Sequence, residues 1–131
     1  MIKRVIGIGN ALTDMLVNLS NDNVLNNFQL AKGSMSLVDS QLQTEISKYV
    51  AGSPYSLSLG GSAANTIRAM ARLGIEVGFI GKVGNDFLGK HLKKVVEEVG
   101  IDTRNLLLDE DVHTTLAFVH TYADGDRDFS F

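Results

Sequence analysis

Two short polar clusters each follow a stretch whose pattern predicts a β-strand. The first is "GIGNALTDM", in which Asn10 and Asp14 come just after apolar residues. The second is "LGGSAAN", which begins a helical pattern with Gly60 and Gly61 and reaches Asn65 one turn later. Ligands of open α/β sheets bind in crevices at the carboxyl ends of strands. Both clusters are therefore candidates for a ligand site.

The residue types in the two clusters suit a ligand that carries hydroxyl groups. Glycines lack a Cβ atom, so the backbone can approach a sugar ring closely and donate from the amino end of a helix. An Asn side chain both donates and accepts, as a hydroxyl group does. An ionised Asp only accepts, and its two oxygens can hold two neighbouring hydroxyls. These features favour a polyol-binding site.

Simpler interpretations stay open at each position. Gly60 and Gly61 could merely turn a strand into a helix, with Ser62 as the N-cap, and Asp14 could be a solvated side chain in a surface turn. Asp86, in "GKVGNDFLGK", is sufficiently explained as the cap of a helix that begins at Phe87.

The sequence lacks residues that two common phosphate-binding motifs require. The segment "GIGNAL" has Leu12 where a dinucleotide fingerprint needs its third glycine. No Gly-Lys-Ser or Gly-Lys-Thr tripeptide occurs, which excludes a Walker A loop. No residue of this chain is therefore expected to bind ATP through a recognisable motif.

Hydrophobic periodicity predicts the elements that position these clusters. Residues 5–9 are typical of a buried strand, residues 62–73 of a helix, "EVGFIGKVG" of a strand, and residues 87–99 of a second helix. Alternating strands and helices predict a parallel α/β layer.

The segments outside this alternating pattern predict further strands and helices. Residues 12–20 predict a strand, 22–28 a short helix, and 40–51 a helix that begins at a capping box of Ser40 and Gln43. After Arg104, "RNLLL" and "TTLAFVHTY" predict strands, and Asp124-Gly125 predicts the turn of a hairpin.

The overall composition excludes several classes of protein. The 131 residues include 44% hydrophobic and 21% charged residues, which is typical of a globular domain. The net charge of -3 argues against nucleic-acid binding, and the absence of cysteine with only three scattered histidines argues against a metal site. No segment has the length of a secretion signal or a membrane span, so we expect a cytoplasmic protein without a membrane partner.

The order and spacing of the motifs resemble the ribokinase-like, or PfkB, family of carbohydrate and nucleoside kinases. "GNALTD" is similar to the family's first substrate-contacting segment, and residues 60–90 are similar to its amino-terminal signature. The resemblance implies that Asp14 and Asn65 bind sugar hydroxyls. It also implies that the same pocket is lined by Asn10, Gly60, Gly61 and Ser62.

The resemblance implies an α/β fold with a ribokinase-like parallel-sheet core and a small β lid, of which only the amino-terminal part is present. Core segments are expected at about residues 1–11 and 39–103, and lid segments at about 12–38 and 104–131. One departure from the family is "HTT", residues 113–115, where relatives commonly have Pro-Thr-Gly. Four lid residues are expected to touch the substrate by their strand positions: Met35, Ala117, Phe129 and Phe131.

The activity implied by the resemblance is ATP-dependent, Mg²⁺-assisted phosphorylation of a hydroxymethyl group on a sugar or nucleoside. The motif spacing looks more like that of adenosine kinases than that of ribokinases, and several sugar kinases share it. The family's later Gly-Ala-Gly-Asp segment, which carries the catalytic base, is absent from this sequence. We therefore expect no catalytic residue here, an acceptor-binding role, and no activity of the chain alone. A stand-alone sugar-binding module remains an alternative, and a homodimer through the lid strands remains open.

Overall fold

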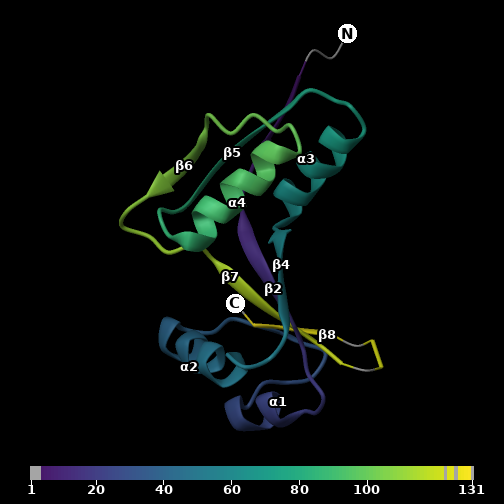
Figure 1. The fold of residues 1–131 in the computed structure, drawn as a ribbon, viewed down its shortest axis with the longest axis vertical. Helices are drawn as coiled ribbons and strands as arrows, with labels where there is room; N and C mark the ends of the chain where they lie inside the picture. The colour runs from purple at the N-terminus through teal and green to yellow at the C-terminus, as the bar shows by residue number, and fades with distance from the viewer. Residues whose placement is uncertain (1–3, 123, 126, 131) are drawn as a thin grey trace. The chain divides into compact units, whose positions relative to one another are not determined.

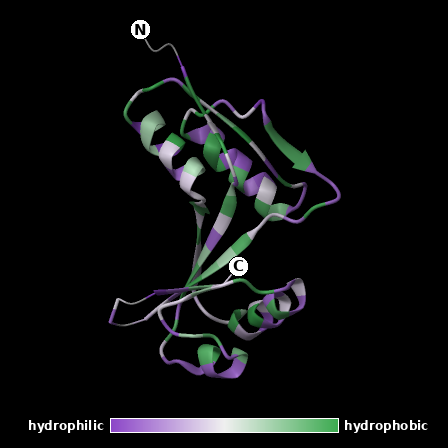
Figure 2. Cartoon of the chain, turned by 180° about the vertical axis from the view of Figure 1, so that it is seen from behind, coloured by the Kyte–Doolittle hydropathy of each residue, from purple (hydrophilic) through white to green (hydrophobic). Residues whose placement is uncertain are grey.

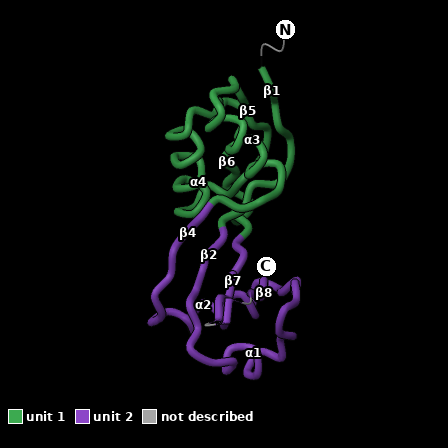
Figure 3. Tube along the Cα trace, turned by 90° about the vertical axis from the view of Figure 1, so that its right-hand side faces the viewer, with its two compact units in different colours: residues 1–13, 59–115 green, residues 14–58, 116–131 purple. Residues whose placement is uncertain are grey.

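A computed structural model describes residues 4–122, 124–125 and 127–130 of the chain. Backbone contacts divide the chain into two units (Figure 3). Unit 1 comprises residues 1–13 and 59–115, and unit 2 comprises residues 14–58 and 116–131. The chain passes between the units within β2 (Leu12–Asn18), within β4 (Tyr55–Gly60) and just before β7 (Leu116–Thr121).

Unit 1 is built on a parallel three-stranded sheet with the order β1 (Val5–Ile8), β5 (Val77–Gly84) and β6 (Leu106–Asp109) (Figure 1). Helix α3 (Ser62–Arg72) contacts β1 and β5, and α4 (Phe87–Glu98) contacts β5 and β6. This succession of strands and helices confirms the predicted parallel layer.

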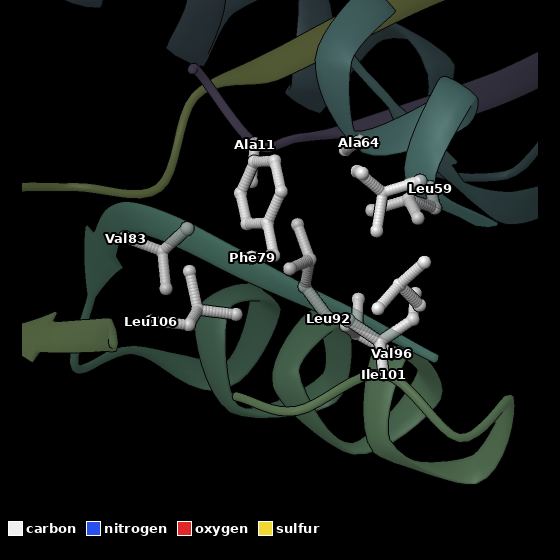
Figure 4. Packing of buried hydrophobic residues seen from close by; sticks show 11 residues of the cluster. Ala11, Leu59, Ala64, Phe79, Val83, Leu92, Val96, Ile101 and Leu106 are labelled. Atoms are coloured by element: carbon white, nitrogen blue, oxygen red, sulfur yellow. The ribbon is translucent and has the colours of Figure 1, made fainter. Parts of the chain in front are cut away.

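The core of unit 1 lies between the two helices and one face of this sheet. Figure 4 shows Leu92 of α4 beside Phe79 of β5, and Val96 of α4 beside Ile101. Burying each such side chain contributes roughly 1.5–3 kcal/mol. The cluster consists of Ala11, Leu59, Ala64, Ile67, Val77, Phe79, Val83, Leu92, Val96, Ile101 and Leu106.

The opposite face of the same sheet is apolar and exposed. Ile8 of β1 is 74% exposed and pairs in register with the exposed Ile80 of β5. Leu107 of β6 is exposed as well, and Figure 2 colours the β6 arrow as hydrophobic. The strand predicted at residues 5–9 is therefore present, but it is buried on one face only, because the described helices of unit 1 cover one face of the sheet.

Unit 2 contains a mixed five-stranded sheet in the order β3-β8-β7-β2-β4, with β3 at Met35–Ser36 and β8 at Arg127–Ser130. Strands β7 and β8 are antiparallel, and Gly125 between them has φ 90°, which confirms the predicted hairpin. Helices α1 (Asn23–Phe28) and α2 (Ser40–Val50) contact each other, and the rings of Phe28 and Tyr49 meet edge to face.

Strand β7 is the middle strand of this sheet, and its residues from Leu116 to His120 are buried. Strands β3 and β4 form the two sheet edges. A homodimer through lid strands stays a prediction, and it would have to use strands other than β7.

The boundaries of the two units differ from the expected core and lid segments. Residues 39–58 were expected in the core but lie in unit 2, where the Gln43 side chain donates to the Leu116 carbonyl at 3.0 Å. Residues 104–115 were expected in the lid but lie in unit 1, because β6 pairs with β5. The cap of α2 is Asp39, which accepts from the Leu42 amide, and not Ser40.

Candidate substrate-binding residues

The junction of β4 and α3 in unit 1 requires glycine. Strand β4 ends at the buried Gly60, and Gly61 is the N-cap of α3 with φ 94°. This backbone conformation is strained for residues with a Cβ. A Cβ on Gly61 would also collide with the carbonyl oxygen of Asn10. The structure therefore brings Asn10 and Gly61 into direct contact. The positive φ and the lack of space for a Cβ both explain why this residue is glycine.

The amino end of α3 has no side-chain cap. The N-cap is Gly61, so the expectation that Ser62 could cap the helix is wrong; Ser62 is the first helical residue. The first turn also contains no acidic residue. Backbone N–H groups at a helix start have no partner within the helix, and the helix dipole is positive there. This end of α3 is therefore available to donate hydrogen bonds to a ligand.

Two exposed amide side chains accompany this helix end. Asn10 follows β1, and its backbone lies against Gly61. Asn65 lies one turn into α3, and its backbone N–H donates to the Gly61 carbonyl at 2.9 Å. Two residues whose backbones adjoin Gly61 thus carry exposed amide side chains, which can both donate and accept.

The predicted site residues of unit 2 lie in its five-stranded sheet. Asp14 is half-buried in β2. Met35 pairs in register with Phe129, and Phe129 pairs with Val119. Because alternate residues of a strand share a face, Ala117 lies on the same sheet face as Met35 and Phe129.

The exposure of these three side chains differs widely. Met35 is 69% exposed, Phe129 is half-buried, and Ala117 is only 3% exposed. Within this chain Ala117 thus offers almost no surface to a ligand. Phe131 lies outside the described residues.

Asp86 caps α4 as predicted, but it also has a second partner. Its carboxylate accepts from the Gly89 amide at 2.8 Å and from the hydroxyl and amide of Thr114, each at 2.8 Å. Burial by itself raises the pKa of Asp86, but the hydrogen bonds from Thr114 and Gly89 outweigh this effect and lower it. The "HTT" segment, which departs from the family pattern, is therefore held in place by Asp86.

Within the described parts of the chain, no three acidic or histidine side chains are grouped so that they could hold a metal ion. In the same residues, no helix combines the length and the apolar character that crossing a membrane requires.

Comparison with known proteins identifies the family. The model of the pfkB family of carbohydrate kinases matches residues 29–131. The chain belongs to this family. Fructokinase-1 of Oryza sativa subsp. japonica is 42% identical over 72 residues, which are 55% of this chain and 22% of the fructokinase. The chain thus matches less than a quarter of the length of this relative.

Solved structures show the same fold. Adenosine kinase from Sinorhizobium meliloti is 27% identical with a TM-score of 0.77, over 98% of this chain and 38% of that one. Fructokinase from Xylella fastidiosa, solved with bound ATP, is 29% identical with a TM-score of 0.67, over 98% of this chain and 30% of that one. The fold is therefore the ribokinase-like α/β fold that the sequence predicted.

Proposed function

We propose that this chain supplies the acceptor-binding residues of a kinase that transfers the γ-phosphate of ATP to a hydroxymethyl group of a sugar or nucleoside. The main support for the proposal is the uncapped amino end of α3, in a chain that belongs to a family of carbohydrate kinases. This helix end has no side-chain cap, it begins at a glycine held against Asn10, and Asn65 is exposed one turn later. Kinases that act on fructose and on adenosine are both similar to the chain.

The individual residues have distinct roles in this proposal. Asp14 accepts hydrogen bonds from two neighbouring hydroxyls, and Asn65 binds a further hydroxyl. Asn10, Gly60, Gly61 and Ser62 line the pocket, where backbone N–H groups donate to the acceptor. Met35 and Phe129 contact an apolar part of the acceptor, and Ala117 and Phe131 are proposed to lie nearby.

Positioning is the contribution of these residues to catalysis. Phosphoryl transfer passes through a loose transition state, so catalysis consists mainly of alignment and charge neutralisation. A firmly held acceptor presents its hydroxymethyl oxygen in line with the γ-phosphate. ATP and Mg²⁺ belong to the proposed reaction, but we assign no residue of this chain to either of them, and none as the catalytic base.

Titration calorimetry of the chain with fructose, ribose and adenosine tests this proposal. We expect binding heat with at least one of the three, lost in Asn65→Ala and retained in Asn105→Ala, an exposed Asn of the same unit. Heat without ADP release from ATP supports acceptor binding without catalysis by the chain alone. No heat with any acceptor contradicts the proposal, and acceptor-dependent ADP release would reveal a phosphate site that we have not assigned.

A further inference from the structure

Asp128 is a buried carboxylate in the sheet of unit 2 that is not among the acceptor-binding residues proposed above. It lies in β8 and is only 2% exposed. Its carboxylate accepts from the Tyr122 hydroxyl at 2.5 Å and from the backbone N–H of Gly33. Within the described residues, no Lys, Arg or His forms an ion pair with it. A buried charge is costly unless it is hydrogen-bonded, so these two donors are needed to keep the carboxylate in place.

One of the two donors belongs to the turn that leads into β3. Strand β3 is an edge strand of two residues, and in the described part of the chain it pairs with β8 alone. Besides the β3–β8 pairing, the Phe129 amide donates to the Ser34 carbonyl at 3.0 Å. Few backbone bonds therefore fix this strand, and the bond from Gly33 to Asp128 adds an anchor at its start.

The second donor, Tyr122, also contacts this turn. Tyr122 is buried, and the Nζ of Lys32 lies 4.4 Å from the centre of its ring. A cation over an aromatic face is attracted to it. Since Lys32 is the neighbour of Gly33, the Tyr122–Asp128 pair contacts two successive residues of the turn. Burial, and then the hydrogen bond to Asp128, raise the pKa of Tyr122, so its hydroxyl remains a donor at neutral pH.

The position of β3 determines where Met35 lies. Met35 is opposite Phe129, which follows Asp128 directly in the sequence. We propose that Asp128 is a positioning residue, which anchors the Gly33 turn and so holds Met35 beside Phe129 for acceptor binding. The effect on the acceptor rests on the proposed function, whereas the anchoring of β3 does not.

Nuclear magnetic resonance of the chain tests the anchoring directly. In Asp128→Asn we expect hydrogen exchange of the Gly33 amide to accelerate about tenfold, as expected for the loss of one charged hydrogen bond, and the Met35 methyl signal to move toward its unfolded position. Tyr122→Phe removes only a hydroxyl and should accelerate Gly33 exchange by a smaller factor. The matched control is Asp111→Asn, which removes one exposed carboxylate in unit 1 and should change neither signal.

The outcomes separate the anchoring from other effects. Unchanged Gly33 exchange and Met35 signals in a folded Asp128→Asn variant would overturn the proposal. If Asp128→Asn does not fold, Tyr122→Phe decides instead: faster Gly33 exchange supports the anchor, and unchanged exchange overturns it.

Acceptor titration of the same variants tests the consequence for binding. If the wild-type chain binds an acceptor, we expect the affinity of Asp128→Asn to be about tenfold lower and that of Asp111→Asn to be unchanged. Equal affinity in Asp128→Asn, despite a loosened β3, would overturn the role in binding. If the wild-type chain binds no acceptor, the proposed function fails, while the Gly33 and Met35 signals still decide whether Asp128 anchors β3.

Discussion

The carboxylate of Asp86 accepts hydrogen bonds from both the backbone N–H and the hydroxyl group of Thr114, each at 2.8 Å. The same carboxylate caps α4 through the Gly89 amide. One side chain therefore joins the start of α4 to the segment just before β7. Nearby, the Gly84 amide donates to the Thr114 hydroxyl at 3.0 Å, and a Cβ on Gly84 would collide with this segment. Gly84 and Asp86, two residues apart, thus serve packing as well as capping.

We predict that Asp86→Ala destabilises the chain by roughly 1–3 kcal/mol, because it removes a helix cap and the acceptor for Thr114. Urea unfolding measures the change. The control is Asp111→Ala, whose side chain is exposed and which should unfold near the wild-type midpoint. Equal midpoints for the two variants would show that the Thr114 contacts contribute nothing to stability.

Gly61→Ala should destabilise the chain more than Gly74→Ala. Both glycines have positive φ, 94° and 81°, so both substitutions introduce backbone strain of about 1–2 kcal/mol. Of the two, Gly61 has a carbonyl oxygen, that of Asn10, in the place of the new Cβ, whereas no atom of the described residues lies within 4 Å of a Cβ on Gly74. Thermal unfolding of the two variants measures the difference. A larger loss in Gly74→Ala would contradict the proposed collision.

The sequence predicts where helices, strands and turns form better than it predicts which strands pair with one another. The periodic patterns of α3 and α4 and the turn at Gly125 depend on residues close in sequence, and all three are confirmed. The run "LLL" in β6 does not indicate which face is buried. Its place beside β5 depends on a long-range pairing, whereas the family resemblance had implied that this segment belongs to the lid.

The same distinction holds for the polar contacts. The capping role of Asp86 is predictable, since it directly precedes the apolar pattern of α4. Its contact with Thr114 joins residues 28 positions apart, and that of Asp128 with Gly33 joins residues 95 positions apart. In the structure, Asp128 shares a buried face of β8 with Ser130, and this burial also depends on the neighbouring strands.

Asp14→Ala should weaken acceptor binding by about tenfold or more, because a carboxylate that holds two hydroxyls contributes roughly 1.5–3 kcal/mol per charged hydrogen bond. Titration calorimetry with the acceptor that binds the wild-type chain measures the loss. Glu45→Ala removes an exposed carboxylate from α2 of the same unit and should leave the affinity unchanged. An Asp14→Ala variant with wild-type affinity would exclude Asp14 from the site.

The side chain of His120 is fully buried in β7, and among the described residues its two ring nitrogens have no hydrogen-bond partner. Burial lowers its pKa from the ordinary 6.5, although Asp128, its partner in β8, acts in the opposite direction. Below about pH 6.5 the unfolded chain therefore binds a proton on this imidazole, whereas the folded chain binds it only at lower pH. We expect the free energy of unfolding to fall as the pH decreases below that value.

Urea unfolding between pH 7.5 and about 4.5 measures this dependence, in a range above the ordinary carboxylate pKa values. His120→Phe should flatten the decrease, because it replaces the titrating ring with an apolar one beside Phe118. His113→Gln, which changes an exposed histidine, should retain the wild-type slope. If His120→Phe keeps the full decrease, other groups are responsible for the acid sensitivity, and the buried imidazole does not control it.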